Sequence, residues 1–305
     1  MENDKAKIFN LIYRSSTSIL KFGICLIFAF YITVLPMEAE AGTIINRPLA
    51  IGLTAGLVGH WTFDQKDMKS NARAYDISGQ NNTGTLTNGP VRAIGRIGQA
   101  LNFDGVNDYV DAGNFNAVGN NRLSLGAWIR RRTTGQWDDI VGKWIDASAQ
   151  SYTITIRGSA PTDAILFAIA SSQGNTKRVV SAAGTLANTA WHHVMATWDG
   201  TTMLIYLDGL ALSTTDSNLG TFSGTIQDVS ASVNISSLSS ENPFDGSIDD
   251  VRVYNRALSA DEIKRLYNLG GTFTVNKSQS TGTLKDGLVG HWTFDQKDMK
   301  SNARA

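Results

Sequence analysis

Apolar and polar residues alternate along most of this chain in short runs, which is the pattern of half-buried β-strands. The first run covers residues 57–64. One face holds Leu57, Gly59, Trp61 and Phe63, and the other holds Val58, His60, Thr62 and Asp64. Similar runs lie at residues 100–103, 109–112, 123–131, 152–157, 165–170, 178–182, 191–198, 203–207 and 248–254. About a dozen short strands separated by turn residues predict an all-β fold of two packed antiparallel sheets.

Two Asp-Gly pairs indicate hairpins within this series. Asp199-Gly200 follows the run 191–198, and Asp208-Gly209 follows the run 203–207. Asp-Gly between alternating runs is a strong short-range hairpin signal. The polar segments 65–74 and 135–151 are rich in turn formers and predict loops.

One segment has the pattern of a helix. Ser259 and Glu262 form a capping box, with the N-cap residue followed three positions later by glutamate. Ile263 and Leu266 then fall on one helical face, and Gly270 can end the helix. The sequence therefore predicts one short C-terminal helix.

An exact repeat suggests the domain organisation. Residues 56–74, GLVGHWTFDQKDMKSNARA, recur letter for letter at 287–305. Repeats of this kind indicate duplicated structural units. We interpret residues 42–55 as a lead-in segment, 56–271 as one domain, 272–286 as a polar linker, and 287–305 as the truncated start of a second repeat in a tandem array.

The N-terminal residues have the pattern of a secretory signal peptide. An apolar run at 22–35 follows several basic residues and precedes the small-residue motif Ala39-Glu40-Ala41. We expect cleavage after Ala41, a signal peptide over 1–41, and a secreted or cell-surface protein. The alternative is an uncleaved membrane anchor, for which the apolar run is short.

The composition narrows the range of partners. Lysine plus arginine and aspartate plus glutamate number 27 each, so the formal net charge is zero. Without a basic field, binding to nucleic acid or, after signal cleavage, to a membrane is not expected. Cys25 is the sole cysteine and lies in the signal peptide, so the mature chain cannot form an internal disulfide.

Several segments resemble the LamG-like jelly-roll domains of secreted bacterial proteins, which are concanavalin A-like sandwiches. The matching stretches are 56–64 (GLVGHWTFD), 76–86, 97–110, 125–129 (LGAWI), 191–194 (WHHV), 205–209 (IYLDG) and 246–258 (GSIDDVRVYNRAL). Together they cover about residues 56–271. The resemblance is specific for the fold and weak for function, because this fold carries lectins, adhesion modules, glucanases and spacers.

The resemblance also implies a calcium site. Relatives often hold a structural Ca²⁺ near the loop after the first strand, and the matching positions are Asp76, Asn82 and Asp249, with Asp250 as an alternative. Carboxylate and amide oxygens are the ligands that Ca²⁺ prefers. The alternative is that Asp76 and Asn82 form Asx turns and Asp249 caps backbone amides.

Catalysis is not expected. Glucanases of this class carry carboxylates spaced E-x-D-x-x-E, a pair of which can act as nucleophile and acid. The nearest match here, residues 247–252, has Ser247 and Arg252 where glutamate is needed. Between residues 42 and 305 the sequence has two glutamates, Glu241 and Glu262, and no zinc or nucleophile motif.

Aromatic side chains can bind sugars by stacking. Trp61, Trp128, Trp191 and Trp198 lie in strand positions and are interpreted as core. Trp137 and Trp144, in or beside the turn-rich segment 135–151, together with Tyr152 are the candidates for an exposed stacking platform, and edge packing is the alternative.

These observations favour a non-catalytic extracellular binding or adhesion module within a tandem LamG array. Its expected partners are carbohydrate or extracellular protein ligands and further repeats of the same domain. Two alternatives remain: a structural spacer without a ligand, and a glycoside hydrolase.

Overall fold

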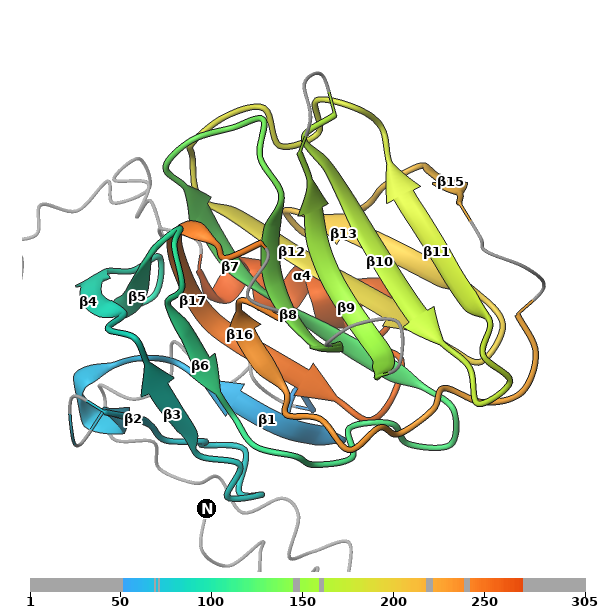
Figure 1. Ribbon diagram of the computed structural model, residues 1–305, viewed down its shortest axis with the longest axis horizontal. Helices are drawn as coiled ribbons and strands as arrows, with labels where there is room; N and C mark the ends of the chain where they lie inside the picture. The colour runs from blue at the N-terminus through green and yellow to red at the C-terminus, as the bar shows by residue number, and fades with distance from the viewer. Residues whose placement is uncertain are drawn as a thin grey trace, which may run out of the picture. The chain divides into compact units, whose positions relative to one another are not determined.

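The computed structural model of the chain describes residues 52–270, apart from 69, 71, 145–148, 159–161, 218–221 and 239–241. The predicted signal peptide, linker and second repeat copy, and most of the lead-in, lie outside the described residues. The described residues form two antiparallel sheets that face each other, with one α-helix (Figure 1). The predicted all-β sandwich with a short C-terminal helix is confirmed.

Sheet 1 has eight strands in the order β14-β13-β12-β7-β17-β5-β4, and β1 also pairs with β17. Both Asp-Gly turns occur as predicted, after β12 and after β13, and the second has φ values of 51° at Asp208 and 80° at Gly209, as a two-residue type I′ turn requires. The strands are β1 (Leu57–Trp61), β4 (Val91–Ile94), β5 (Gln99–Asp104), β7 (Leu123–Arg131), β12 (His192–Trp198), β13 (Met203–Leu207), β14 (Leu210–Ala211) and β17 (Asp245–Tyr254).

Strand β17 connects most of sheet 1. One edge pairs with β7, while the other pairs with β5 over residues 245–248 and then with β1 over residues 251–254. The register shifts between Asp249 and Arg252, and Asp250 has a φ of 48°. This β-bulge bends the strand where its neighbour changes.

Sheet 2 has nine strands in the order β15-β11-β10-β9-β8-β16-β6-β3-β2. The predicted strands 100–103 and 109–112 belong to different sheets, because β5 lies in sheet 1 and β6 in sheet 2. The strands are β2 (Arg73–Ala74), β3 (Gly84–Thr87), β6 (Tyr109–Asp111), β8 (Asp138–Trp144), β9 (Gln150–Arg157), β10 (Ala164–Ala170), β11 (Thr176–Ser181), β15 (Thr214–Asp216) and β16 (Asn234–Ser236).

Two of the predicted loops contain regular structure. Residues 65–74 include a 3-10 helix, η1 (Gln65–Asp67), and β2. Residues 135–151 include β8, whose alternation is hidden because Asp138 and Lys143 are buried and the register shifts around Ile140. The Lys143 ammonium is held by Asn114 Oδ1, the Phe115 carbonyl and the Asp228 carboxylate. These partners offset the cost of burying its charge.

The main core lies between the two sheets. A second apolar cluster lies on the outer face of sheet 1, where Ile263 and Leu266 of helix α4 (Ala260–Leu269) pack with sheet residues such as Met195 and Tyr206. Leu53, from the predicted lead-in segment, joins this cluster. The main core includes Trp61, Phe63, Phe103, Leu125, Ile154, Phe167, Ile235, Phe244 and Val251.

The capping box that the sequence predicted is formed. Ser259 Oγ accepts a hydrogen bond from Glu262 N at 3.3 Å, and Glu262 Oε2 accepts one from Ser259 N at 2.9 Å. Within the described ranges, no helix has both the length and the apolar character needed to cross a bilayer.

Replacing the N-cap residue should weaken the docking of α4. We expect Ser259→Ala to lower the free energy of unfolding by about 1 kcal/mol, because one N-terminal amide of the helix loses its acceptor. Urea unfolding measures this difference. The matched control Ser230→Ala, at an exposed position, should lie within about 0.5 kcal/mol of wild type; equal effects of the two substitutions would contradict the role of the cap.

Candidate ligand-binding face

The two sheets differ in what covers their outer faces. Helix α4 packs on the outer face of sheet 1, whereas the outer face of sheet 2 is turned to the viewer in Figure 1, with α4 behind both sheets. In β10, alternate residues belong to the main core, and the outward Ala164, Leu166 and Ala168 form a separate apolar cluster with Val180 of β11. This part of the outer face is therefore apolar, and the four side chains of the cluster are buried.

Trp144, the last residue of β8, packs against this cluster and is half-buried. Its neighbour Lys143 points to the core side, paired with Tyr152, so Trp144 projects to the outer side. A tryptophan with one ring face against small residues can offer the other to a planar or sugar-like ligand.

Polar groups without partners lie in the same region. The strand register places Asn234 of β16, Gly142 of β8 and Thr153 of β9 in one row across sheet 2. Gly142 is required because an added Cβ would lie 2.8 Å from Thr153 Cα. Thr153 Oγ1 and Asn234 Oδ1 are buried, and neither has a hydrogen-bond partner among the described residues. Such atoms need an explanation, and a bound water is a common one.

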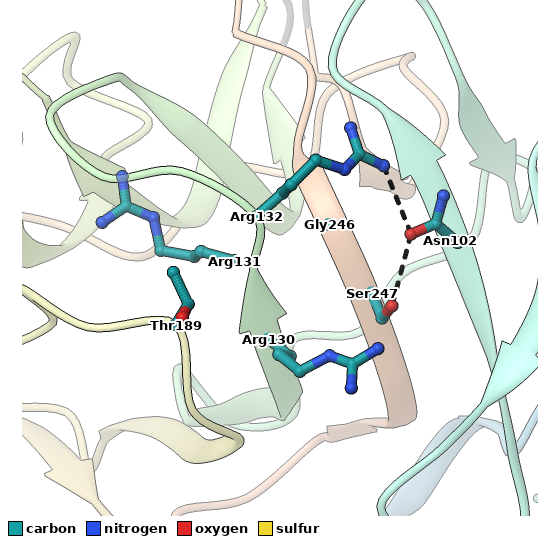
Figure 2. Close-up of a pocket in the computed structure, with 7 residues that line it drawn as sticks. All are labelled: Asn102, Arg130, Arg131, Arg132, Thr189, Gly246 and Ser247. Carbon is teal, nitrogen blue, oxygen red and sulfur yellow. Dashed lines mark hydrogen bonds between the residues drawn. The ribbon is translucent and has the colours of Figure 1, made fainter.

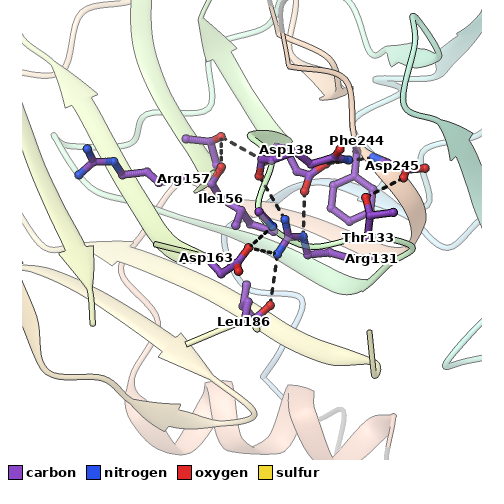
Figure 3. Close-up of polar contacts among 12 residues, drawn as sticks. Arg131, Thr133, Asp138, Ile156, Arg157, Asp163, Leu186, Phe244 and Asp245 are labelled. Carbon is purple, nitrogen blue, oxygen red and sulfur yellow. Dashed lines mark hydrogen bonds and ion pairs between the residues drawn. The ribbon is translucent and has the colours of Figure 1, made fainter. Parts of the chain in front are cut away.

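Trp137 directly precedes β8, at the end opposite to Trp144, on a loop that the buried Arg131 holds. Figure 3 shows the contacts of Arg131. Arg131 Nε donates to Asp138 Oδ2 at 2.8 Å, Nη1 to Asp163 Oδ1 at 2.7 Å, and Nη2 to the Gln136 carbonyl at 3.1 Å. The guanidinium therefore ties both ends of the loop 132–137 to the sandwich.

The two carboxylates of this network respond differently to their surroundings. Burial raises the pKa of Asp138 above its usual value, and the bonds from Asp245 N and Arg131 only partly oppose this. For Asp163 burial also favours the neutral form, but hydrogen bonds from Arg131 and Gly135 N lower its pKa overall. A buried arginine with two carboxylate partners forms a rigid base for the loop.

The predicted stacking residues do not form one platform. Trp137 is 38% exposed and contacts the Arg157 guanidinium, 5.7 Å from the ring centroid. Trp144 lies on the same outer side but about 20 Å along β8, at about 3.3 Å per residue. Tyr152 is fully buried, which contradicts its proposed place in an exposed platform. Tyr152 alternates in β9 with outward residues and shares the core-facing side with Ile154 and Ile156.

The aromatic residues predicted as core are mostly confirmed. Trp61, Trp128 and Trp198 are buried, but Trp128 lies outside the main core, stacked on Tyr267 of α4 with ring centroids 5.4 Å apart. Trp191 is half-buried, so the core prediction is wrong for this residue.

Asp76 and Asn82, two of the predicted calcium ligands, are hydrogen-bonded to the backbone around β1. Asp76 Oδ1 accepts from His60 N at 3.0 Å and Ser78 N at 2.8 Å, and Oδ2 accepts from Asn82 N at 2.9 Å. Asn82 Nδ2 donates to the Val58 carbonyl at 2.7 Å. The Asp76–Ser78 contact is the Asx turn that the sequence left as the alternative.

Asp249 and Asp250 are buried at the β17 bulge and face different partners. Asp249 Oδ2 accepts from Arg96 N and Ile97 N, both at 2.8 Å, while its Oδ1 has no partner among the described residues. Asp250 accepts from His60 Nε2 at 2.6 Å and Arg252 Nε at 2.9 Å.

These contacts set opposite charge preferences for the two carboxyl groups. Burial raises the pKa of Asp249 to about 7, and the nearby Asp250 charge adds to this. Asp250 is also penalised by burial, but Arg252 and His60 hold its pKa well below the usual range. Burial lowers the pKa of His60, so we assign its neutral imidazole as the donor to Asp250.

The four residues do not fit a calcium ion in this arrangement. Asp76 and Asp249 Oδ2 face N–H donors, and Asp250 faces a guanidinium, whereas Ca²⁺ requires about 6–8 converging oxygens. Within the described part of the chain, no three His, Cys, Asp or Glu side chains are placed to hold a metal.

The outer-face residues Thr153, Asn234 and Gly142 were missed from the sequence. A usable signal was present in the run 164–170, AILFAIA, which is apolar on both faces with small residues at alternate positions. That pattern indicates a strand with a large inward face and a small outward face. The position of Asn234 beside Gly142 could not be predicted, because it depends on pairing between β16 and β8, which are distant in the sequence.

Comparison with protein families identifies the fold independently. A family model described as the concanavalin A-like lectin/glucanases superfamily matches residues 104–264, more than half of the 305 residues. No curated protein matches the sequence.

Solved structures agree at low identity. Domain 4 of AbnA, an extracellular GH43 arabinanase from Geobacillus stearothermophilus solved with arabinotriose, is 19% identical with a TM-score of 0.52, covering 70% of this chain and 98% of that chain. The binding domain of Paraclostridial Mosquitocidal Protein 1 is 16% identical with a TM-score of 0.51, covering 71% of this chain and 52% of that one. Trypanosoma rangeli sialidase is 16% identical with a TM-score of 0.52, covering 70% of this chain and 32% of its own. These likenesses show the fold alone.

Melting with and without calcium tests the calcium prediction. Because both carboxylate oxygens of Asp76 and of Asp250, and Oδ2 of Asp249, already accept hydrogen bonds from protein groups, we expect the Tm in millimolar Ca²⁺ to equal that with chelator. An ion that binds the folded state would instead raise the Tm by mass action. A calcium-dependent rise that Asp76→Asn removes would show that these residues do bind the ion.

The raised pKa of Asp249 predicts a pH-dependent stability. A carboxyl group with a raised folded-state pKa stabilises the fold below its unfolded value near 4, and this contribution is lost as pH rises through about 7. A shift of three units corresponds to roughly 4 kcal/mol. We therefore expect the free energy of unfolding of Asp249→Asn to rise, relative to that of wild type, by on the order of 4 kcal/mol between pH 4 and pH 8.

Chemical unfolding across this pH range measures the effect. The control Asp216→Asn makes the same substitution at an exposed position, and the effect at Asp249 is judged against it. Parallel curves for Asp249→Asn and wild type would show that Asp249 is not held protonated by burial.

Proposed function

The chain belongs to the concanavalin A-like lectin/glucanase superfamily, and we propose that its domain is a non-catalytic extracellular module that binds carbohydrate through the outer face of sheet 2. The signal-peptide pattern at 1–41 supports secretion or cell-surface display, and the exact repeat at 287–305 supports a tandem array of such domains. Among structures of the same fold, the arabinanase domain was solved with a bound arabinotriose, which supports a sugar ligand by analogy.

The observation that carries the proposal is the grouping around Trp144. A half-buried indole packs on small apolar residues, close to two polar atoms, Thr153 Oγ1 and Asn234 Oδ1, that have no partner among the described residues. Sugars present an apolar ring face that can stack on the indole. The two polar atoms are closed to solvent, so a sugar hydroxyl reaches them once neighbouring side chains move aside.

The buried state of the carboxylates supports a non-catalytic role. Asp249 and Asp250, in the segment nearest to the glucanase motif, are 0% and 4% exposed and bond to protein groups. Glu262 caps α4 and pairs with Arg256 at 2.7 Å. A retaining or inverting mechanism needs two carboxyl groups that flank the substrate.

Removal of the Trp144 ring should abolish most of the binding. A broad glycan array with the full chain identifies a ligand, and calorimetry then compares variants. We expect Trp144→Ala to weaken binding at least tenfold, because a central aromatic contact is typically worth about 2 kcal/mol or more. Thr153→Val should weaken it by a smaller factor, since one hydrogen bond is lost.

The matched control is Leu210→Ala, which removes an apolar side chain that is 65% exposed on β14 of sheet 1. It should leave the affinity within twofold of wild type. An array with no bound glycan would favour the structural spacer, and equal affinities for Trp144→Ala and Leu210→Ala would place the site elsewhere.

A further inference from the structure

A polar cleft lies at one end of sheet 1, away from the outer face of sheet 2. Its volume is about 320 Å³. Helix α4 ends against Trp128, and Arg130 lies two residues further along the same face of β7, beyond the part that the helix covers. The lining residues are Asn102, Arg130, Arg131, Arg132, Thr189, Gly246 and Ser247 (Figure 2).

The strand register builds the floor of this cleft. Asn102 of β5, Ser247 of β17 and Arg130 of β7 lie in one row across sheet 1. Trp191, just before β12, extends the row, and the Arg130 guanidinium lies 5.1 Å from its ring centroid. The ring therefore supports the guanidinium from one side.

The three consecutive arginines differ in their partners. Arg131 is buried and pairs with Asp138 and Asp163, and Arg132 pairs with Asp245. Arg130 is exposed and forms no ion pair with any described residue. One guanidinium in the cleft thus keeps an uncompensated positive charge.

The other polar groups of the cleft are donors. Ser247 Oγ and Arg132 Nη2 both donate to Asn102 Oδ1, each at 3.4 Å. This fixes the orientation of the amide and leaves its Nδ2 hydrogens to donate elsewhere. Thr189 is exposed and adds a hydroxyl, and no carboxylate is among the lining residues.

We propose that this cleft binds the carboxylate or sulfate group of an acidic polysaccharide. The guanidinium of Arg130, in the middle of the row, supplies charge-assisted hydrogen bonds to the anion. Asn102 Nδ2 on one side and Thr189 Oγ1 on the other are placed to bind hydroxyl groups of the sugars around it. The inference rests on the proposed carbohydrate-binding function and adds a preference for acidic sugars. The zero net charge of the chain means that a general electrostatic field does not account for such a preference.

Calorimetry with the full chain tests the proposal, using polygalacturonate for the carboxylate, dextran sulfate for the sulfate, and dextran as the neutral match. We expect at least one acidic polymer to bind and Arg130→Gln to weaken that binding at least tenfold, because charge-assisted bonds are lost. Arg130→Lys should recover part of the affinity, since it restores the charge without the planar fork.

The matched control is Arg122→Gln, which removes the same charge from an exposed arginine just before the other end of β7. It should leave the affinity for the acidic polymer within twofold of wild type. Equal losses for Arg130→Gln and Arg122→Gln, or no binding of either acidic polymer, would overturn the proposal. Inorganic sulfate that competes fully at concentrations matching the polymer's sulfate groups would reduce the site to a free-anion site and also overturn it.

The result can be separated from that of the proposed function. If an array glycan still depends on Trp144 while acidic polymers do not depend on Arg130, the cleft proposal alone fails. If no glycan of any kind binds, both fail.

Discussion

The structure depends on how β17 buries charge at its bulge. Asp250 is nearly inaccessible and would strongly destabilise the fold if it were unpaired, so its ion pair with Arg252 and its hydrogen bond from His60 are required. His60 belongs to β1, and its backbone N–H also bonds to Asp76. The pairing of β1 with β17 and the course of the following loop are thus joined to the same buried carboxylate.

The aspartates singled out from the sequence have protein partners of the same kinds. The aspartates that resemble calcium ligands or glucanase carboxylates are bonded to backbone amides, to arginine or to histidine. Surfaces away from the bulge remain for ligand contacts. Helix α4 covers much of the outer face of sheet 1, which leaves the outer face of sheet 2 and the end of sheet 1 beyond Trp128.

Local patterns were sufficient to predict the fold class, the two Asp-Gly turns and the capping box, because each depends on neighbouring residues. Strand β8 was missed because its buried Asp138 and Lys143 read as polar loop residues, although distant partners satisfy them. Tyr152 was placed on the surface although it belongs to the predicted strand 152–157, where it shares a face with Ile154 and Ile156, and that face lies in the main core. The row of Asn234, Gly142 and Thr153 could not be predicted, because it depends on the pairing of β16 with β8, which are distant in the sequence. No local pattern shows such pairing.

The segment Arg130-Arg131-Arg132 shows why a charge cluster in a sequence does not by itself indicate a site. The period of two in a strand sends Arg131 to the side opposite Arg130 and Arg132. Arg131 becomes a structural anchor between two aspartates, and Arg132 is neutralised by Asp245, so the tripeptide keeps one uncompensated charge. That charge lies on the face that α4 leaves uncovered and beside a row of donors, and its position follows from the register of β17 with β7. Strand β17 buries Asp249 and Asp250 at its bulge. Near its N-terminal end, the same strand pairs with β7 and so sets the position of Arg130.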